Sequence, residues 1–198
     1  MSETERSFCP AIERLTMTTV TAPGVSTTAT ALRRLYFARF GFAVVWAVVT
    51  FAIADELSAL TATLLVIYPL VDAAAAVVDL RSSRTTTLLS VNIVVSLLAA
   101  VGLAVASTSG IPAVLRVWGA WAVVAGLVQL IVGVTRRGMG GQWPMIISGG
   151  LSVLAGGAFV AAASAEDPAL TNAIGYAIPG AILFLIAAIR LRRTAKTN

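Results

Sequence analysis

Long apolar runs separated by short polar turns dominate this sequence, and they restrict its possible folds more than any other feature. Each run is close to the roughly 20 apolar residues that an α-helix needs to cross a bilayer. In lipid the backbone must satisfy its own hydrogen bonds, which favours helices over irregular structure. The sequence therefore predicts an all-α, polytopic transmembrane helical bundle. Its six spans occupy approximately residues 36–54, 58–80, 86–107, 112–135, 143–164 and 170–189.

The charge content also indicates a chain embedded in lipid. Only 12% of the 198 residues are charged, which is about half the usual share of a soluble domain. We expect a disordered polar N-terminal tail over residues 1–35, because this stretch is rich in Thr and Ser and lacks an apolar face. A six-span transmembrane domain (residues 36–190) and a basic cytoplasmic C-terminal tail (residues 191–198) follow. The lipid bilayer is the expected partner.

Basic residues alternate along the chain in a pattern that predicts its orientation. Cytoplasmic loops of membrane proteins carry an excess of Lys and Arg. We therefore expect a multi-pass protein of the cytoplasmic membrane with both termini in the cytoplasm (N-in/C-in). This pattern accounts for the formal net charge of +5, so no nucleic-acid partner is expected. The residues on the basic side are Arg33, Arg34, Arg39, Arg81, Arg84, Arg136, Arg137, Arg190, Arg192, Arg193 and Lys196.

Arg116 is the single basic residue that this pattern places near the outer face, at the start of the fourth span. One interpretation is that its side chain extends to the lipid headgroups, as long basic side chains do near helix ends. The other is an ion pair with Asp55, Glu56, Glu166 or Asp167 in the outer loops. The first interpretation is the simpler one and is preferred.

Several catalytic chemistries lack their residues in this sequence. It contains no histidine and one cysteine, Cys9, so the common zinc and haem sites and His-based triads are absent. The loop "GVTRRGMGGQ" lacks the GK[ST] ending of a phosphate-binding loop, and no strand precedes it. We therefore predict no enzymatic activity, no metal and no cofactor.

The even-numbered spans end in similar basic segments. Arg81, Arg136 and Arg190 follow one another at intervals of about 55 residues. A period of this length is typical of repeat architectures. The simplest account is three helical hairpins in tandem.

Small residues at four-residue spacing form stripes along several spans. Helices in lipid associate by close packing, and small side chains permit that approach. We therefore predict helix-packing roles for Ser96 and Ala100 in the third span, Gly126 in the fourth, and Ser152 and Gly156 in the fifth.

Asp72 is the most informative single residue, because a carboxylate inside a membrane is costly and usually functional. It lies about nine residues before the charged end of the second span. Asn92 and Gln129 lie at similar depths in neighbouring spans. Tyr68 precedes Asp72 by one turn on the same helix face, and Ser148 lies at a shallower depth. Together these five residues form a candidate intramembrane polar layer.

Two interpretations of this layer remain open. In the functional one, Asp72 binds a proton or a cation, with Asn92 and Gln129 as neutral partners. In the structural one, a protonated Asp72 donates a hydrogen bond to Asn92 or Gln129 and locks the bundle together. The structural interpretation draws support from the presence of only one intramembrane acid, since a proton relay usually needs several ionisable groups.

Two consecutive segments, "VWGAWAVVAGLVQLIVGVTRR" and "QWPMIISGGLSVLAGGAFV", together form a recognisable sequence pattern. A helix ends in a basic pair, and a short loop, a tryptophan and a Gly-rich helix follow. This pattern resembles that of the HdeD-type family of small six-span bacterial membrane proteins. The resemblance implies a bacterial inner membrane and a link to survival in acid, and it supplies no catalytic residues. The residues that carry it are Gly119, Gly126, Arg136, Arg137, Trp143, Gly149, Gly150, Gly156 and Gly157.

From these features we predict an integral membrane protein of HdeD type that serves envelope or acid-stress protection. In the mechanistic form of this prediction, Asp72 responds to protons or cations. The alternatives are a small-solute transporter and a structural or partner-binding membrane subunit. Self-association into a homo-oligomer is left open.

Overall fold

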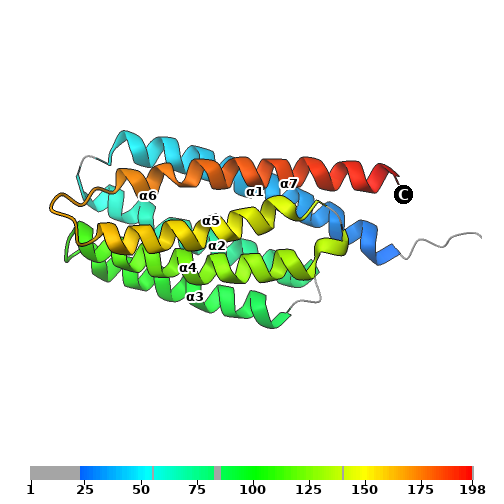
Figure 1. Cartoon of the computed structure of the whole chain (residues 1–198), viewed down its shortest axis with the longest axis horizontal. Coiled ribbons are helices and arrows are strands. Elements are labelled where there is room, and N and C mark those ends of the chain that lie inside the picture. Colours follow the sequence, from blue (N-terminus) through cyan, green and yellow to red (C-terminus); the bar gives the residue numbers. More distant parts are fainter. Residues whose placement is uncertain (1–22, 55, 83–85, 140, 198) are drawn as a thin grey trace, which may run out of the picture.

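The computed structural model describes residues 23–54, 56–82, 86–139 and 141–197. Six long apolar helices form an elongated bundle (Figure 1), which confirms the predicted fold class. Each of the six is long and apolar enough to cross a membrane, and the last span combines α6 and α7. The helices are α1 (Pro23–Ala52), α2 (Ala59–Ser82), α3 (Thr86–Ala106), α4 (Ile111–Thr135), the 3₁₀ turn η1 (Arg137–Met139), α5 (Trp143–Ala162), α6 (Thr171–Gly175) and α7 (Ala177–Thr197).

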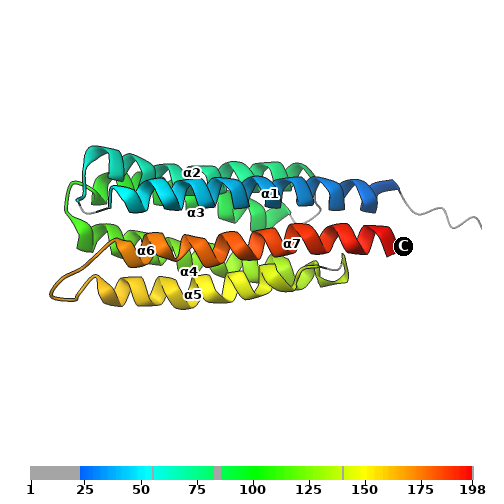
Figure 2. The same cartoon turned by 90° about the horizontal axis from the view of Figure 1, so that it is seen from above.

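The six spans form a closed ring. Each span packs against the next one along the chain, and α7 packs back against α1. Figure 2 shows α1, α2 and α3 on one side of the bundle, with α4, α5 and α7 on the other. The closest pairs are α2 with α3, α4 with α5, and α1 with α7. The tightest packing therefore joins one predicted hairpin to the next, and the interior of the ring is shared by all three.

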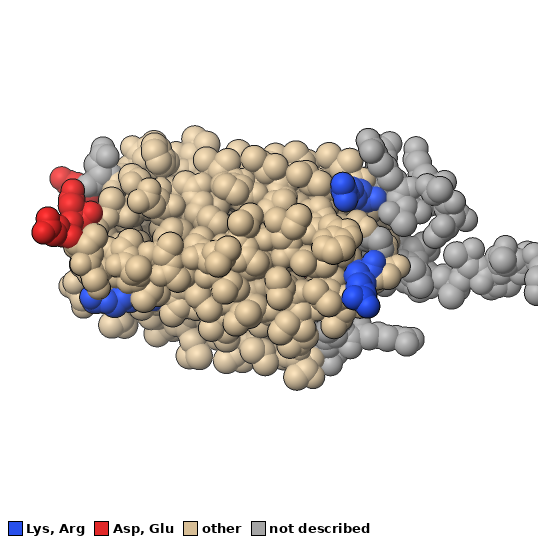
Figure 3. All heavy atoms as spheres, in the orientation of Figure 1, with Lys and Arg blue, Asp and Glu red and all other residues tan. Residues whose placement is uncertain are grey.

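The two ends of the bundle differ in charge. The start of α1 and the end of α7 lie at one end (Figure 2), which we call the basic end. Acidic side chains gather at the opposite, acidic end (Figure 3), where Glu56, Glu166 and Asp167 are exposed in loops. Arg116 is also exposed, and it forms no salt bridge with any residue that the structure describes. This placement agrees with the headgroup interpretation; Asp55, one of the alternative partners, lies outside the described residues.

The first helix starts earlier than predicted. Pro23 begins α1, at a position where proline is well tolerated because the first helical N–H needs no intrahelical partner. Leu32 is only 1% exposed and packs in a cluster with Phe184 and Leu191 of α7. The expectation of a disordered tail up to residue 35 is therefore wrong from Pro23 onward. Leu32 and Tyr36 contact the α7 cluster, and the polar composition of this segment does not reveal such packing.

The remaining part of the predicted N-terminal tail, residues 1–22, lies outside the described residues. At the other end of the chain, α7 continues to Thr197. The segment predicted as a C-terminal tail, residues 191–198, is thus helical through Thr197. Its first residue, Leu191, is buried against α1 and α5 residues and therefore belongs to the bundle.

Glycines allow α4 and α5 to approach closely. A Cβ atom added to Gly156 would lie 2.5 Å from the backbone oxygen of Gly119 and 2.8 Å from the backbone nitrogen of Val123. A Cβ atom on Gly126 would lie 2.6 Å from the Cβ atom of Ser152. Because backbone atoms cannot move aside cheaply, only glycine permits this contact. Gly126, Gly156 and Ser152 thus lie in a helix interface, as their spacing predicts.

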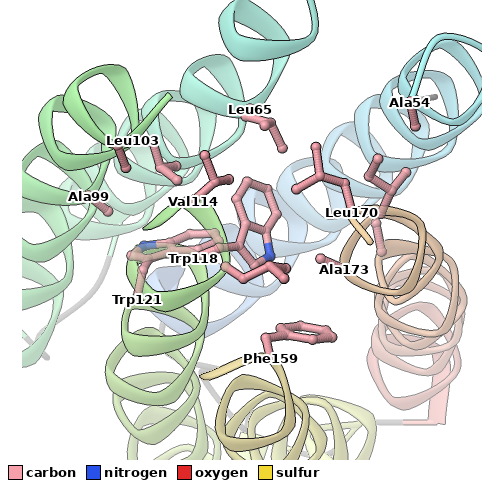
Figure 4. Packing of buried hydrophobic residues seen from close by; sticks show 14 of the residues in the cluster. Ala54, Leu65, Ala99, Leu103, Val114, Trp118, Trp121, Phe159, Leu170 and Ala173 are labelled. Atoms are coloured by element: carbon pink, nitrogen blue, oxygen red, sulfur yellow. The ribbon is translucent and has the colours of Figure 1, made fainter. Parts of the chain in front are cut away.

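Aromatic and aliphatic side chains (Figure 4) fill the interior of the bundle in the half near its acidic end. The rings of Trp46 and Trp118 stack with centroids 5.6 Å apart, and Tyr68 packs edge-on to Trp46 at 4.5 Å. Such ring pairs add about 0.5–1.5 kcal/mol beyond the area that they bury. On α3, Ala100 is buried; its helix-packing role stays a prediction. This cluster closes the interior of the bundle toward the acidic end.

Candidate functional site

A cavity of about 120 Å³ lies inside the ring, and all six spans contribute residues to its wall. It occupies the half of the bundle near the basic end, next to the aromatic cluster. A single water needs only about 10–15 Å³ of such volume, so the cavity can hold several waters or a small solute. Its polar lining consists of Tyr36, Arg39, Tyr68, Asp72, Asp79, Asn92, Gln129, Arg136, Gln142, Ser148, Ser152 and Tyr176.

Asp72 is the centre of a hydrogen-bond network that joins four helices. Arg39 of α1 forms an ion pair with its Oδ1 atom. On α3, Asn92 Nδ2 and Ser96 Oγ donate to Oδ2 at 2.7 and 2.9 Å. Trp121 Nε1 of α4 in turn donates to Ser96 Oγ at 3.0 Å. All three direct partners donate to the carboxyl group, which is the arrangement that an ionised carboxylate requires.

This network corrects two expectations about the polar layer. Arg39, assigned from the sequence to the cytoplasmic side, lies inside a span and is the ion-pair partner of Asp72. The locking interaction in which a protonated Asp72 donates to Asn92 or Gln129 is wrong, because Asn92 is the donor. Gln129 lines the same cavity but donates to the backbone carbonyl of Met145 at 3.3 Å.

A second buried acid, Asp79, lies seven residues after Asp72 on α2. Arg136, directly after α4, binds it through two parallel hydrogen bonds of 2.7 and 3.0 Å. Tyr36 of α1 lines the cavity together with this pair. The expectation of a single intramembrane acid is therefore wrong. Asp79 was missed because it stands two residues before Arg81 and resembles part of the charged end of the span.

Helical spacing is the sequence signal that could have identified Arg39 and Asp79 as inward-facing residues. Asp72 and Asp79 are seven residues apart, which is about two turns and places them on one face of α2. Tyr36 and Arg39 are three residues apart and share one face of α1. Each of these helices thus presents two polar groups to the interior of the ring, at two depths.

The remaining candidate residues surround the same cavity. Tyr68 and Ser148 line its wall without a hydrogen bond to any residue that the structure describes. Tyr176 donates to Ser152 Oγ at 2.9 Å. Ser152 therefore faces the cavity in addition to packing against Gly126. Ser96, predicted only as a packing residue, takes part in the Asp72 network.

The charges at this site balance, since two carboxylates face two guanidinium groups. Every oxygen of the two carboxylates accepts at least one hydrogen bond. The described part of the chain contains no cluster of three or more Cys, Asp or Glu that could hold a metal ion. The arrangement is suited to holding a polar solute by hydrogen bonds, or to exchanging the partners of an ion pair.

Comparisons with protein-family models, curated proteins and solved structures found no match to this chain. They identify no family, so the site must be interpreted from its own geometry. What the chain does show is its architecture: it is a multi-pass membrane protein with six candidate spans arranged around a polar cavity.

Proposed function

We propose that this protein binds a small polar solute in its central cavity and carries it across a bacterial cytoplasmic membrane. The observation that supports this is the cavity itself, enclosed by all six spans and lined by the Arg39–Asp72 and Arg136–Asp79 pairs. Burying ion pairs is expensive, and apolar side chains would join helices at least as well. Charged groups inside a membrane usually mark the path of a polar solute.

The position of the cavity suggests the side from which the solute enters. The aromatic cluster closes the ring toward the acidic end, whereas the cavity extends to residues at the basic end such as Arg136 and Gln142. With both termini in the cytoplasm, entry in this state is from the cytoplasm. The proposed role is not enzymatic, because both carboxylates at the cavity are engaged by arginines and neither is available as a general base.

Thiol labelling tests whether the cavity is reached by solutes. Ser148→Cys places a thiol on the cavity wall, and Ala99→Cys places one at a buried α3 position away from it. Both variants are made in a Cys9→Ser background, which removes the single native cysteine. A small charged thiol reagent applied to the cytoplasmic face of inverted vesicles should label the first variant roughly tenfold faster, since thiol reactivity depends on access.

Equal and slow labelling of both variants, from either face, would contradict the proposal. The cavity would then be sealed, and the structural-subunit interpretation would take its place.

A second candidate function is acid-stress protection, as the resemblance to HdeD-type proteins implies. The observation that favours it is the position of the Arg39–Asp72 pair on the cavity wall. Protonation of Asp72 would leave Arg39 without its counter-charge in a poorly hydrated place, and this would favour separation of the pair. A fall in cytoplasmic pH after external acid exposure would thereby change how α1 packs against α2.

The cytoplasmic pH after an external acid shift tests this second candidate. Cells carrying the wild type, a deletion, or Asp72→Asn at a matched membrane level are compared. We expect pH recovery to slow in the deletion and in Asp72→Asn alike. Normal recovery in the deletion would remove the acid-stress role and leave the solute proposal in place.

A further inference from the structure

Arg39 has more hydrogen-bond donors than the structure uses. A guanidinium group carries five N–H donors, yet the only hydrogen-bond acceptor of Arg39 among the described residues is Asp72. One face of the guanidinium lies over the ring of Phe184, with the Cζ atom of Arg39 4.5 Å from the ring centroid. The side chain is 22% exposed and lines the cavity. Arg39 is therefore held in position by two contacts and keeps donors available at the cavity wall.

The other groups on the wall increase this excess of donors. Both oxygens of Asp72 and both oxygens of Asp79 already accept hydrogen bonds. The hydroxyls of Tyr68 and Ser148 have no partner among the described residues and can donate. A desolvated metal cation needs several oxygen ligands, and the four carboxylate oxygens at the wall are already engaged by donors. The spare capacity of the cavity thus suits a solute that accepts hydrogen bonds.

We propose that the solute is a small monocarboxylate whose carboxylate binds Arg39. This inference rests on the proposed function and specifies its substrate class. Guanidinium and carboxylate groups match in charge and in planar geometry. Apolar lining residues, including Trp118, Ala122 and Ala125, provide a surface for a short hydrocarbon chain.

Binding in this mode places the solute in competition with Asp72. The two carboxylates seek the same guanidinium, so occupancy of the cavity weakens the link between α1 and α2. Removing the Asp72 charge should therefore strengthen solute binding, whereas removing the Arg39 charge should abolish it. A purely structural role of the pair would instead make both changes weaken binding.

Protection of Ser148→Cys from the thiol reagent measures binding directly. Butyrate is the anionic probe, and tetramethylammonium at the same ionic strength is the cationic control. We expect butyrate to slow labelling in a saturable way and tetramethylammonium to have no effect.

Variants of the ion pair, made in the same labelling background, provide the sharper test. Asp72→Asn should lower the butyrate concentration for half-protection by roughly tenfold, because a competing charge-assisted hydrogen bond is gone. Butyrate should also raise the melting temperature of this variant more than that of the wild type. Arg39→Gln should lose protection. If Arg39→Gln does not fold, Arg39→Lys retains the charge without the planar fork and should weaken protection.

The remaining outcomes contradict either the carboxylate assignment or the proposed function. Protection by tetramethylammonium alone, or weaker butyrate binding in Asp72→Asn, would overturn the carboxylate assignment while leaving a solute-accessible cavity. Rapid labelling that neither probe slows would also overturn the assignment. Failure of Ser148→Cys to react at all would instead overturn the proposed function on which it rests.

Discussion

Replacing Asp72 with asparagine is expected to lower the free energy of unfolding by about 3 kcal/mol, because it leaves the half-buried Arg39 without its counter-charge. Asn92 and Ser96 can still hydrogen-bond to an asparagine, so the loss comes mainly from Arg39. Arg39 is only partly exposed and cannot recover full hydration without moving α1. Reversible unfolding in detergent micelles, followed by circular dichroism, measures the change.

The double variant Asp72→Asn/Arg39→Gln separates the pair from its parts. We expect it to be more stable than Asp72→Asn alone, because no unpaired charge remains inside the bundle. Glu56→Gln, which removes an exposed acid, serves as the control and should leave stability unchanged. If the two single changes simply add in the double variant, the ion pair has no energetic coupling and its proposed importance is wrong.

Replacing Gly156 with alanine is expected to cost about 3 kcal/mol, at the upper end of the range for overpacked interiors. The added methyl group would meet the backbone of α4 at 2.5 Å from the Gly119 oxygen. The two helices must separate to admit it. The neighbouring Gly157 is a matched control, because a Cβ atom there would have no atom within 4 Å. Gly157→Ala should be neutral or stabilising by up to about 1 kcal/mol, since alanine is the better helix former.

Unfolding of the two glycine variants under the same conditions as Asp72→Asn provides the comparison. Equal stability of Gly156→Ala and Gly157→Ala would show that α4 and α5 do not approach as closely as described. A second measurement is the labelling rate of Ser148→Cys combined with Gly156→Ala. This rate should rise if separation of α4 and α5 widens the cavity.

The spans could be predicted well from the sequence because they depend on local properties. Apolar length and flanking charges located all six helices to within a few residues, apart from the start of α1 and the end of α7. Near those two limits, Leu32 of α1 and Leu191 of α7 are buried in one cluster of distant segments. Hydropathy does not report contacts of this kind. Ring closure by α1 and α7 was unpredicted for the same reason.

The depth of the candidate residues in the membrane could be predicted from the sequence, but the direction in which their side chains point could not. Counting residues from the charged ends placed Asp72 and Asn92 at one depth. In the structure, Asn92 Nδ2 lies 2.7 Å from Asp72 Oδ2. The same counting could not show that Gln129 binds a backbone carbonyl of α5 instead. Arg39 and Asp79 were treated as boundary charges because of their position near span ends. Only the packing of α1, α2 and α4 around one interior turns them inward.

The separation of the ion-pair partners along the chain has a consequence for how the protein is made. Arg39 precedes Asp72 by 33 residues, so both exist once the first hairpin has been synthesised. Arg136, the partner of Asp79, lies 57 residues farther along the chain and is therefore synthesised later. An unpaired aspartate at the centre of a helix costs roughly 2.5–3.5 kcal/mol during insertion, and less near the boundary. The second helix therefore enters the bilayer incompletely neutralised, and its final depth is set only when the fourth helix arrives. Placement of the second helix is in this sense completed late in biogenesis, when the charge pair begun two helices earlier finds its partner.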